Sequence, residues 1–246
     1  GSITLDGKKI DYSMTDKIGF LTEERSLLTK MTVVEQVKFY AILKNMKEED
    51  IVKRLDYYLD KFGISEYKYK KIKELSKGNQ QKIQFITSII HEPKILILDE
   101  PFSGLDPINV ELFKKEILEL KEKGTSIIFS SHRMEHVELF CDELVILVHG
   151  KSVLQGNLKD IKKKYRKKNI QLCCKGDVDK LKDIDGVLDI IKEAGTDTYI
   201  IKISDDTVVD KVFEVVKTFK SVTKFNVEEA TLNEIFISKV GEAYEK

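Results

Sequence analysis

The sequence predicts a mixed α/β protein with a parallel sheet in its N-terminal part and a small split βαβ domain at its C-terminal end. Two apolar runs, 95–98 and 126–129, have the length and composition of buried strands. The segment between them repeats apolar residues at helical spacing. A strand, helix, strand crossover joins parallel neighbours. The order of strands and helices after residue 169 indicates the second domain.

Length and composition limit the possible classes. The chain has 246 residues, 41% of them hydrophobic, enough for one large core or two modest ones. Its 42 basic residues balance 42 acidic ones, so we expect no nucleic-acid partner. Three cysteines without a CxxC pair exclude zinc and disulfide scaffolds, and no apolar run approaches the length of a membrane span. We expect a soluble, cytoplasmic protein.

Two helices are expected ahead of the parallel strands. Thr32 and Glu35 form a capping box that starts a helix running to about Asn45. A second helix ends at Gly63 and carries one apolar stripe, formed by Ile51, Leu55, Tyr58, Leu59 and Phe62. The run 95–98 is apolar without a break, so its strand is expected to be buried on both faces. Segments 144–148 and 152–154 predict a hairpin at the edge of the same region.

The composition changes after Gly156. A basic run follows, which we interpret as a solvated helix end or linker, the alternative being a contact for phosphate, lipid or nucleic acid; it comprises Lys159, Lys162, Lys163, Lys164, Arg166, Lys167 and Lys168. The order of a split βαβ sandwich comes next, with strands at 170–174, 187–191, 198–203 and 222–227 and helices at 178–182 and 208–218. Thr231 and Glu234 begin a last helix, 232–240. The predicted domains are 1–158 and 169–246, joined by a basic linker, 159–168.

Acidic side chains stand where the first buried strand ends. Ligands of open α/β sheets bind at the carboxyl ends of the strands, so Asp99 can hold Mg²⁺ through water there. Glu100 can orient and deprotonate an attacking water. His132 ends the next parallel strand at the same edge. Taken alone, the two acids can also mark an ordinary turn, and a lone histidine is more often structural.

A candidate anion site lies earlier in the chain. Ser76 precedes a helix whose buried stripe contains Ile83, Ile86 and Ile90, and backbone amides at such a helix start can bind an anion. A serine cap on an ordinary helix is the alternative.

The ordered set LSKGNQQK, ILILDEP, SGLDP and a strand-end histidine resembles the nucleotide-binding subunit of ABC transporters. The resemblance implies a P-loop NTPase-like core that uses ATP and Mg²⁺. It assigns Asp99 to the metal, Glu100 to the catalytic base and His132 to the switch histidine. The residues it assigns to nucleotide binding are Ser76, Lys77, Gly78 and Asn79 of the signature and Asp106 of the D-loop.

Three positions depart from the family pattern. Residues 18–23 resemble the strand entering the Q-loop, where Glu23 replaces the usual glutamine and can still reach the metal. Lys77 replaces a glycine of the signature, and Asn79 replaces its glutamine.

The C-terminal part resembles the accessory domain of sodium- and drug-export subunits, and the segment EEATLNEIFI, 228–237, is similar to its closing helix. Implied partners are a transmembrane permease subunit and a second ATP-binding subunit, in a homodimer or a heterodimer. These partners imply a peripheral position on the inner face of the cell membrane.

The phosphate-loop motif GxxxxGK[ST] is absent from the sequence. Gly150, Lys151 and Ser152 supply a GKS, but Val145 stands at the first glycine position and a strand follows in place of a helix. The family places this loop ahead of a segment like 2–10, so the resemblance implies an N-terminally truncated core with exposed apolar surface. Losing three charge-assisted hydrogen bonds costs at least ~4 kcal/mol, so we expect this chain alone to bind ATP poorly and to be inactive.

Three functions remain open at this point. The first is the ATP-hydrolysing motor of an exporter, which dimerises around MgATP. The second is a non-hydrolytic partner, or an inactive fragment, that offers its signature helix to an intact ATPase. The third makes the C-terminal domain a regulatory sensor, by analogy of fold alone.

Overall fold

The computed structural model describes the whole chain except residues 25, 165–167, 230 and 245–246. The chain divides into two compact units, 1–132 and 133–246. The domain boundaries expected at 158 and 168 stay predictions, and Arg166 and Lys167 of the basic run lie outside the described residues. No helix in the described ranges has the length and hydropathy of a membrane span.

The N-terminal unit alternates strands with helices. Its elements are β1 (Thr4–Leu5), β2 (Lys8–Lys9), the 3₁₀ helix η1 (Tyr12–Lys17), β3 (Ile18–Leu21), α1 (Val33–Leu43), α2 (Glu48–Lys61), the 3₁₀ helices η2 (Ser65–Tyr67) and η3 (Ile72–Glu74), α3 (Lys77–Ile89), β4 (Ile95–Asp99), α4 (Pro107–Glu122) and β5 (Ser126–Ser130).

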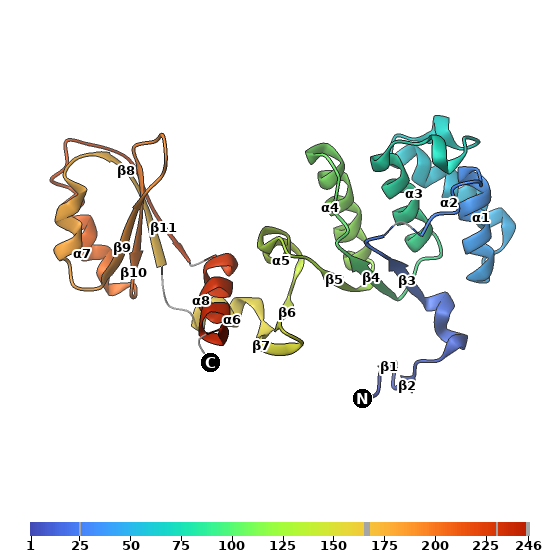
Figure 1. Cartoon of the computed structure of the whole chain (residues 1–246), viewed down its shortest axis with the longest axis horizontal. Coiled ribbons are helices and arrows are strands. Elements are labelled where there is room, and N and C mark those ends of the chain that lie inside the picture. Colours follow the sequence, from blue (N-terminus) through green and yellow to red (C-terminus); the bar gives the residue numbers. More distant parts are fainter. Residues whose placement is uncertain (25, 165–167, 230, 245–246) are drawn as a thin grey trace. The chain divides into compact units, whose positions relative to one another are not determined.

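This unit contains a parallel sheet in the order β3-β4-β5, and α3 and α4 lie on one side of it (Figure 1). Leu21 pairs with Leu98, and Asp99 pairs with Ser130, so the three strands end side by side. The predicted parallel crossover from β4 through α4 to β5 is confirmed.

Only one face of the sheet is deeply buried. Leu96 and Leu98 are buried on the side that α3 covers, while Phe20 and Ile128 on the opposite face are 56% and 60% exposed. The expectation that β4 is buried on both faces is therefore wrong. An unbroken apolar run does not reveal which face the helices cover, and Ile97 is half-buried here.

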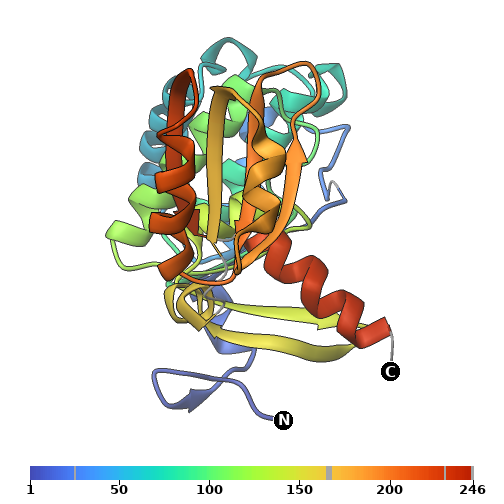
Figure 2. The same ribbon diagram turned by 90° about the vertical axis from the view of Figure 1, so that its left-hand side faces the viewer.

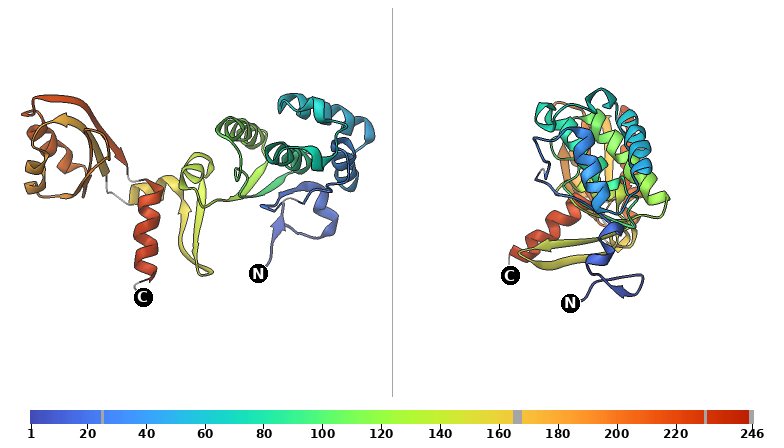
Figure 3. Two further views of the ribbon diagram at one scale, coloured as in Figure 1. Left: turned by 45° about the horizontal axis from the view of Figure 1, so that its top comes forward. Right: turned by 90° about the vertical axis from the view of Figure 1, so that its right-hand side faces the viewer.

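The helices pack through aromatic side chains. Phe62 after α2, Phe85 on α3 and Phe113 on α4 are buried, with ring centroids 4.5–5.9 Å apart. The predicted capping box at the start of α1 is confirmed, because Thr32 and Glu35 exchange hydrogen bonds. α1 also packs against α2 and α3 (Figure 3).

The C-terminal unit contains the second predicted fold. Its elements are α5 (Met134–Phe140), β6 (Glu143–Val148), β7 (Lys151–Asn157), α6 (Leu158–Lys164), β8 (Lys168–Lys175), the 3₁₀ helix η4 (Val178–Asp183), β9 (Val187–Lys192), β10 (Thr198–Ile203), α7 (Thr207–Val216), β11 (Ser221–Glu229) and α8 (Leu232–Tyr244).

The predicted split βαβ arrangement is confirmed. The antiparallel sheet has the order β11-β8-β10-β9, and η4 and α7 lie against one of its faces (Figure 2). The first connecting helix differs from expectation because η4 is a short 3₁₀ helix, and the segment is only six residues long.

The predicted hairpin is confirmed: β6 and β7 pair as a two-stranded antiparallel sheet. His149 and Gly150 both have positive φ, which suits a tight two-residue turn. The apolar residues of the hairpin pack against α6 and α8, through Leu158, Ile161, Leu232 and Ile235.

Candidate functional site

Asp99 and Glu100 lie at the carboxyl end of β4 and accept hydrogen bonds from serines at the end of β5 and directly after it. The hydroxyl of Ser130 donates to Asp99 Oδ1 at 2.5 Å. The Glu100 amide donates to the carbonyl and hydroxyl oxygens of Ser130, each at 3.3 Å. Ser131 Oγ donates to Glu100 Oε2 at 3.4 Å. The end of β5 therefore sets the orientation of both carboxylates.

His132 contacts the second of these carboxylates directly. Its backbone amide donates to Glu100 Oε1 at 2.7 Å, and its Nδ1 lies 2.7 Å from the same oxygen. A carboxylate accepts hydrogen bonds, so Nδ1 carries the proton and Nε2 is the ring nitrogen left for a ligand. The His132 side chain is 78% exposed, whereas that of Glu100 is 16% exposed. The structure thus brings together the predicted base and the predicted switch histidine.

The backbone of Glu100 is strained. Its φ is +44°, a left-handed conformation that costs a residue with a side chain about 1 kcal/mol or more. The two hydrogen bonds from its amide to Ser130 stabilise this conformation. Strain of this kind gathers at functional sites, because it fixes a side chain in a direction that relaxed backbone would not give.

The signature residues begin α3. Ser76 caps the helix, and its Oγ accepts a hydrogen bond from the Asn79 amide at 3.2 Å. Gln80 donates to the carbonyls of Ile72 and Leu75, which fixes the preceding loop. Ser76 and Lys77 are exposed, and the first-turn amides of a helix attract anions. The start of α3 is therefore a candidate anion site.

Glu23 and Asp106 occupy different surroundings. Glu23 is exposed after β3, where Gln84 of α3 donates to the carbonyl and hydroxyl oxygens of Thr22 at 3.0 and 3.1 Å. Asp106 caps α4: the hydrogen bond from the Asn109 amide, together with one from its side chain, lowers the pKa of Asp106. Asp106 therefore has a structural role in this chain, as the N-cap of α4.

Among the described residues, Asp99 offers an oriented carboxylate as a ligand for Mg²⁺. No group of three or more His, Cys, Asp or Glu side chains that could hold a metal occurs among the described residues. Magnesium is commonly held by one or two carboxylates, the rest of its shell being water and substrate phosphates. Asp99 meets that requirement, because its carboxylate is half-buried at the strand end and oriented by Ser130.

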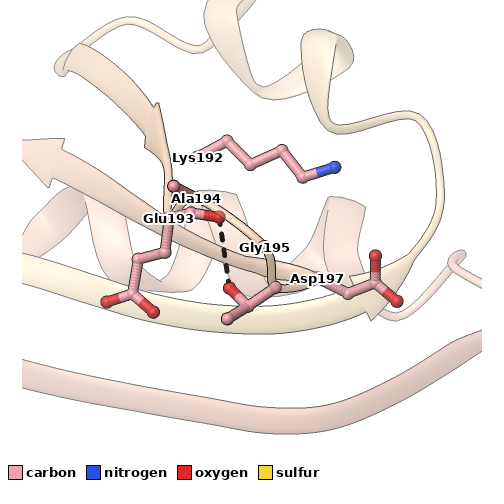
Figure 4. Close-up of a pocket in the computed structure, with 6 residues that line it drawn as sticks. Lys192, Glu193, Ala194, Gly195 and Asp197 are labelled. Carbon is pink, nitrogen blue, oxygen red and sulfur yellow. Dashed lines mark hydrogen bonds between the residues drawn. The ribbon is translucent and has the colours of Figure 1, made fainter.

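A shallow hollow lies in the C-terminal unit. It is lined by the turn between β9 and β10, residues 192–197, where the Thr196 hydroxyl donates to the Glu193 carbonyl (Figure 4). The hollow is open and is formed by consecutive residues of one turn, so it offers a ligand little enclosure.

Sequence reasoning missed the residues that orient the site, namely Ser130, Ser131 and Gln84. A signal for Ser130 was present in the sequence, because Ser130 directly follows the run 126–129 just as Asp99 directly follows the run 95–98. Two parallel strands of equal length bring these two positions together. Hydroxyl groups beside carboxylates at neighbouring strand ends are natural hydrogen-bond donors.

Taken together, these features define an α/β protein with a parallel sheet, carboxylates at the carboxyl edge of that sheet and a serine-capped helix. The ABC transporter family profile matches residues 1–103, and the profile of the ATP-binding protein DrrA1-3-like C-terminal domain matches residues 156–240. YhaQ of Bacillus subtilis, an uncharacterised ABC transporter ATP-binding protein, is 46% identical over 245 residues, which are 100% of this chain and 82% of YhaQ. A similar protein of Alkalihalophilus pseudofirmus is 47% identical over 99% of this chain and 91% of its own length. The chain belongs to the ABC transporter ATP-binding protein family, as its sequence predicted.

Two solved structures share the fold. One, an ATP-binding subunit of an ABC transporter, superposes with a TM-score of 0.63 at 28% identity, over 67% of this chain and 70% of the other. The second, cbiO1 from Clostridium perfringens, is described as part of the ABC transporter complex cbiONQ; its TM-score is 0.53 at 32% identity, over 66% and 70%. The predicted ABC ATPase-like core is confirmed.

Proposed function

We propose that this chain is the hydrolytic part of an ATP-binding subunit that powers export through a membrane permease. The observation that carries the proposal is the contact between Glu100 and His132 at the carboxyl edge of the parallel sheet. Glu100 would take the proton of the attacking water, and His132 would hold the water or the γ-phosphate through Nε2. Asp99 and Glu23 would hold Mg²⁺, which neutralises charge on the phosphates.

The signature residues would act on a second subunit. Ser76, Lys77, Gly78 and Asn79 start an exposed helix, so their amides and the Lys77 ammonium would contact the γ-phosphate bound by the partner, and Asp106 would lie at the same contact. Two such subunits, alike or different, would enclose two MgATP molecules. This arrangement requires a GxxxxGK[ST] loop, which the 246 residues do not contain.

The permease contact is proposed on α1. Phe39, Ile42 and Leu43 of this helix are exposed, although α1 is buried on its other side by the helical layer. An apolar helix face of this kind suits a short segment of a membrane subunit, and it would place the protein on the inner face of the membrane. Replacing Phe39 and Leu43 with serine should abolish copurification with the permease, whereas Val52→Ser on α2 should not. Equal copurification of both variants would refute this surface.

The hydrolytic role is tested by Glu100→Gln in a polypeptide that carries GxxxxGK[ST] in frame ahead of Gly1. Turnover should fall about 10²- to 10⁴-fold while the Kd for MgATP changes little, because glutamine keeps the shape but cannot accept the proton. Glu111→Gln, an exposed change on α4, is the control. Unchanged hydrolysis by Glu100→Gln would reject this role of Glu100.

A second candidate is a non-hydrolytic partner that supplies only its signature helix. It is supported by the well-formed serine-capped α3, because offering this helix start to a partner requires no phosphate loop of its own. The coding sequence ahead of Gly1 separates the two candidates: an in-frame GxxxxGK[ST] favours the motor, and a natural start codon there favours the partner.

A further inference from the structure

The outer edge of the C-terminal sheet is unusually open. β11 and β9 are the two outer strands of the order β11-β8-β10-β9, and β11, with nine residues against six, is the longer. Eight of its residues are exposed, and only Phe225 is half-buried. Residues 224–229 pair with β8 without a register shift and contain no proline. A long, regular edge of this kind can add a further strand, because no other described strand pairs with its outward amide and carbonyl groups.

An apolar strip follows the same edge. Phe225 and Val227 lie on the face that α7 covers, because Phe225 contacts Phe213 of that helix at a ring-centroid distance of 5.0 Å. Phe213 and Val227 remain 42% and 36% exposed. A strand added to β11 would therefore gain apolar contacts as well as backbone hydrogen bonds.

The charged side chains on the other face of β11 indicate which strand can pair with it. Lys224, Asn226 and Glu228 alternate with Phe225 and Val227, so they lie on the face away from α7. If a second β11 pairs antiparallel about a twofold axis at Asn226, each Lys224 lies opposite Glu228 of the second copy, and each Phe225 opposite its Val227. A twofold axis at Phe225 or Val227 would leave Lys224 without an acidic partner. Opposite charges in directly opposed positions stabilise a strand pair.

We propose that a second copy of this chain binds along β11 in this register, joining two C-terminal sheets into one continuous sheet. The contact needs no nucleotide, and it is independent of the ATP-dependent dimer proposed above. In the single chain, Lys224 donates to Gln171 and Glu228 accepts from Asn226, both on the exposed face, so these side chains can turn to the second copy at little cost.

The first test is sedimentation equilibrium of the full chain in nucleotide-free buffer at low salt. The wild type should form a dimer. Lys224→Glu and Glu228→Lys should each raise the dimer Kd at least tenfold, because each places like charges opposite one another twice. Folding of each variant is checked by circular dichroism.

Mixing the two variants gives the sharpest test. Lys224→Glu carries only acids at these positions and Glu228→Lys only bases, so an equimolar mixture should form a heterodimer about as tightly as the wild type self-associates. Effects within a single chain cannot produce this rescue. A monomeric wild type, single variants that dimerise like the wild type, or a mixture that stays monomeric would each overturn the proposal.

A disulfide tests the register. In a background with Cys141, Cys173 and Cys174 replaced by serine, Asn226→Cys should cross-link two chains under mild oxidation, because residues opposed on antiparallel strands have Cα atoms about 4.5–5.5 Å apart. Ser221→Cys on the same strand should not, because it lies five residues from the axis. Equal cross-linking of the two variants would contradict pairing about Asn226.

Discussion

Glu100 accepts two hydrogen bonds from one residue, His132, through a single oxygen: the amide nitrogen and Nδ1 both lie 2.7 Å from Oε1. The carboxylate therefore contacts His132 through Oε1, whereas Ser131 donates to its other oxygen, Oε2, at the longer distance of 3.4 Å. We infer that Oε2 is the oxygen that would accept a proton from water.

Replacing His132 with alanine should lower ATP turnover while leaving MgATP binding nearly unchanged. The backbone amide of the variant can still donate its hydrogen bond to Glu100, but the imidazole that would reach the γ-phosphate is lost. In the longer polypeptide with a phosphate loop, turnover should fall about 10²-fold or more, while the Kd for MgATP changes less than about threefold. His149→Asn, at a positive-φ turn position that asparagine tolerates, is the control. Turnover equal to wild type would rule out this role of His132.

The ion pair between Lys61 and Glu116 should be required for stability. Glu116 is buried, and Lys61 pairs with it and with Glu119. Burial alone would lower the pKa of Lys61, but the hydrogen bonds that its ammonium donates to Glu116 and Glu119 outweigh burial and raise that pKa. Lys61→Met leaves a buried unpaired carboxylate and should cost about 3–5 kcal/mol in urea unfolding.

Two further variants check this explanation. The double replacement Lys61→Met with Glu116→Met should recover most of the loss, because no charge is then buried. Lys53→Met on the exposed side of α2 should change the unfolding free energy by less than about 0.5 kcal/mol. A Lys61→Met variant as stable as wild type would show that Glu116 finds another partner.

His91 should make the stability depend on pH. Burial lowers its pKa to about 4, although Nε2 lies 3.2 Å from the Ile18 carbonyl, and Lys44 and Arg54 add repulsion that Asp16 partly offsets. The unfolded state, with an ordinary histidine pKa, binds the proton more readily between about pH 4 and 6.5. The stability from neutral His91 is therefore present above pH 6.5 and lost as the pH falls toward 4.

Urea midpoints at pH 7 and pH 4.5 measure this loss, which should be on the order of 2–3 kcal/mol for His91. His91→Gln can still donate to the Ile18 carbonyl but does not titrate, so its midpoint should fall less over the same range. Equal falls for the variant and the wild type would assign the pH dependence to other groups.

Gly19 should tolerate no side chain. A Cβ there would lie 2.2 Å from the Ser88 carbonyl oxygen and 2.9 Å from Leu96, where α3 packs against β3. Gly19→Ala should destabilise the N-terminal unit by about 1–3 kcal/mol, because a backbone atom must move. Gly241→Ala, on α8 with open space around it, should be neutral or slightly stabilising. The thermal midpoints of both variants provide the comparison.

Local patterns predicted most of the elements correctly. The capping pairs Thr32–Glu35 and Thr231–Glu234 form in the structure, because a helix start depends on residues three apart. The exposure of Phe20 and Ile128 could not be predicted in the same way. An apolar run on a strand is equally consistent with one or two covered faces, and the choice depends on helices distant in sequence.

The amino-acid order alone determined the family, the parallel crossover and the identity of the two strand-end acids, since each follows from spacing along the chain. Only the tertiary structure decided that Ser130 holds Asp99, that His132 donates to Glu100, and that Lys61 meets Glu116. These contacts depend on strand register and helix packing, which bring together residues some 30 to 55 positions apart. Such pairings leave no periodic signal in a single sequence.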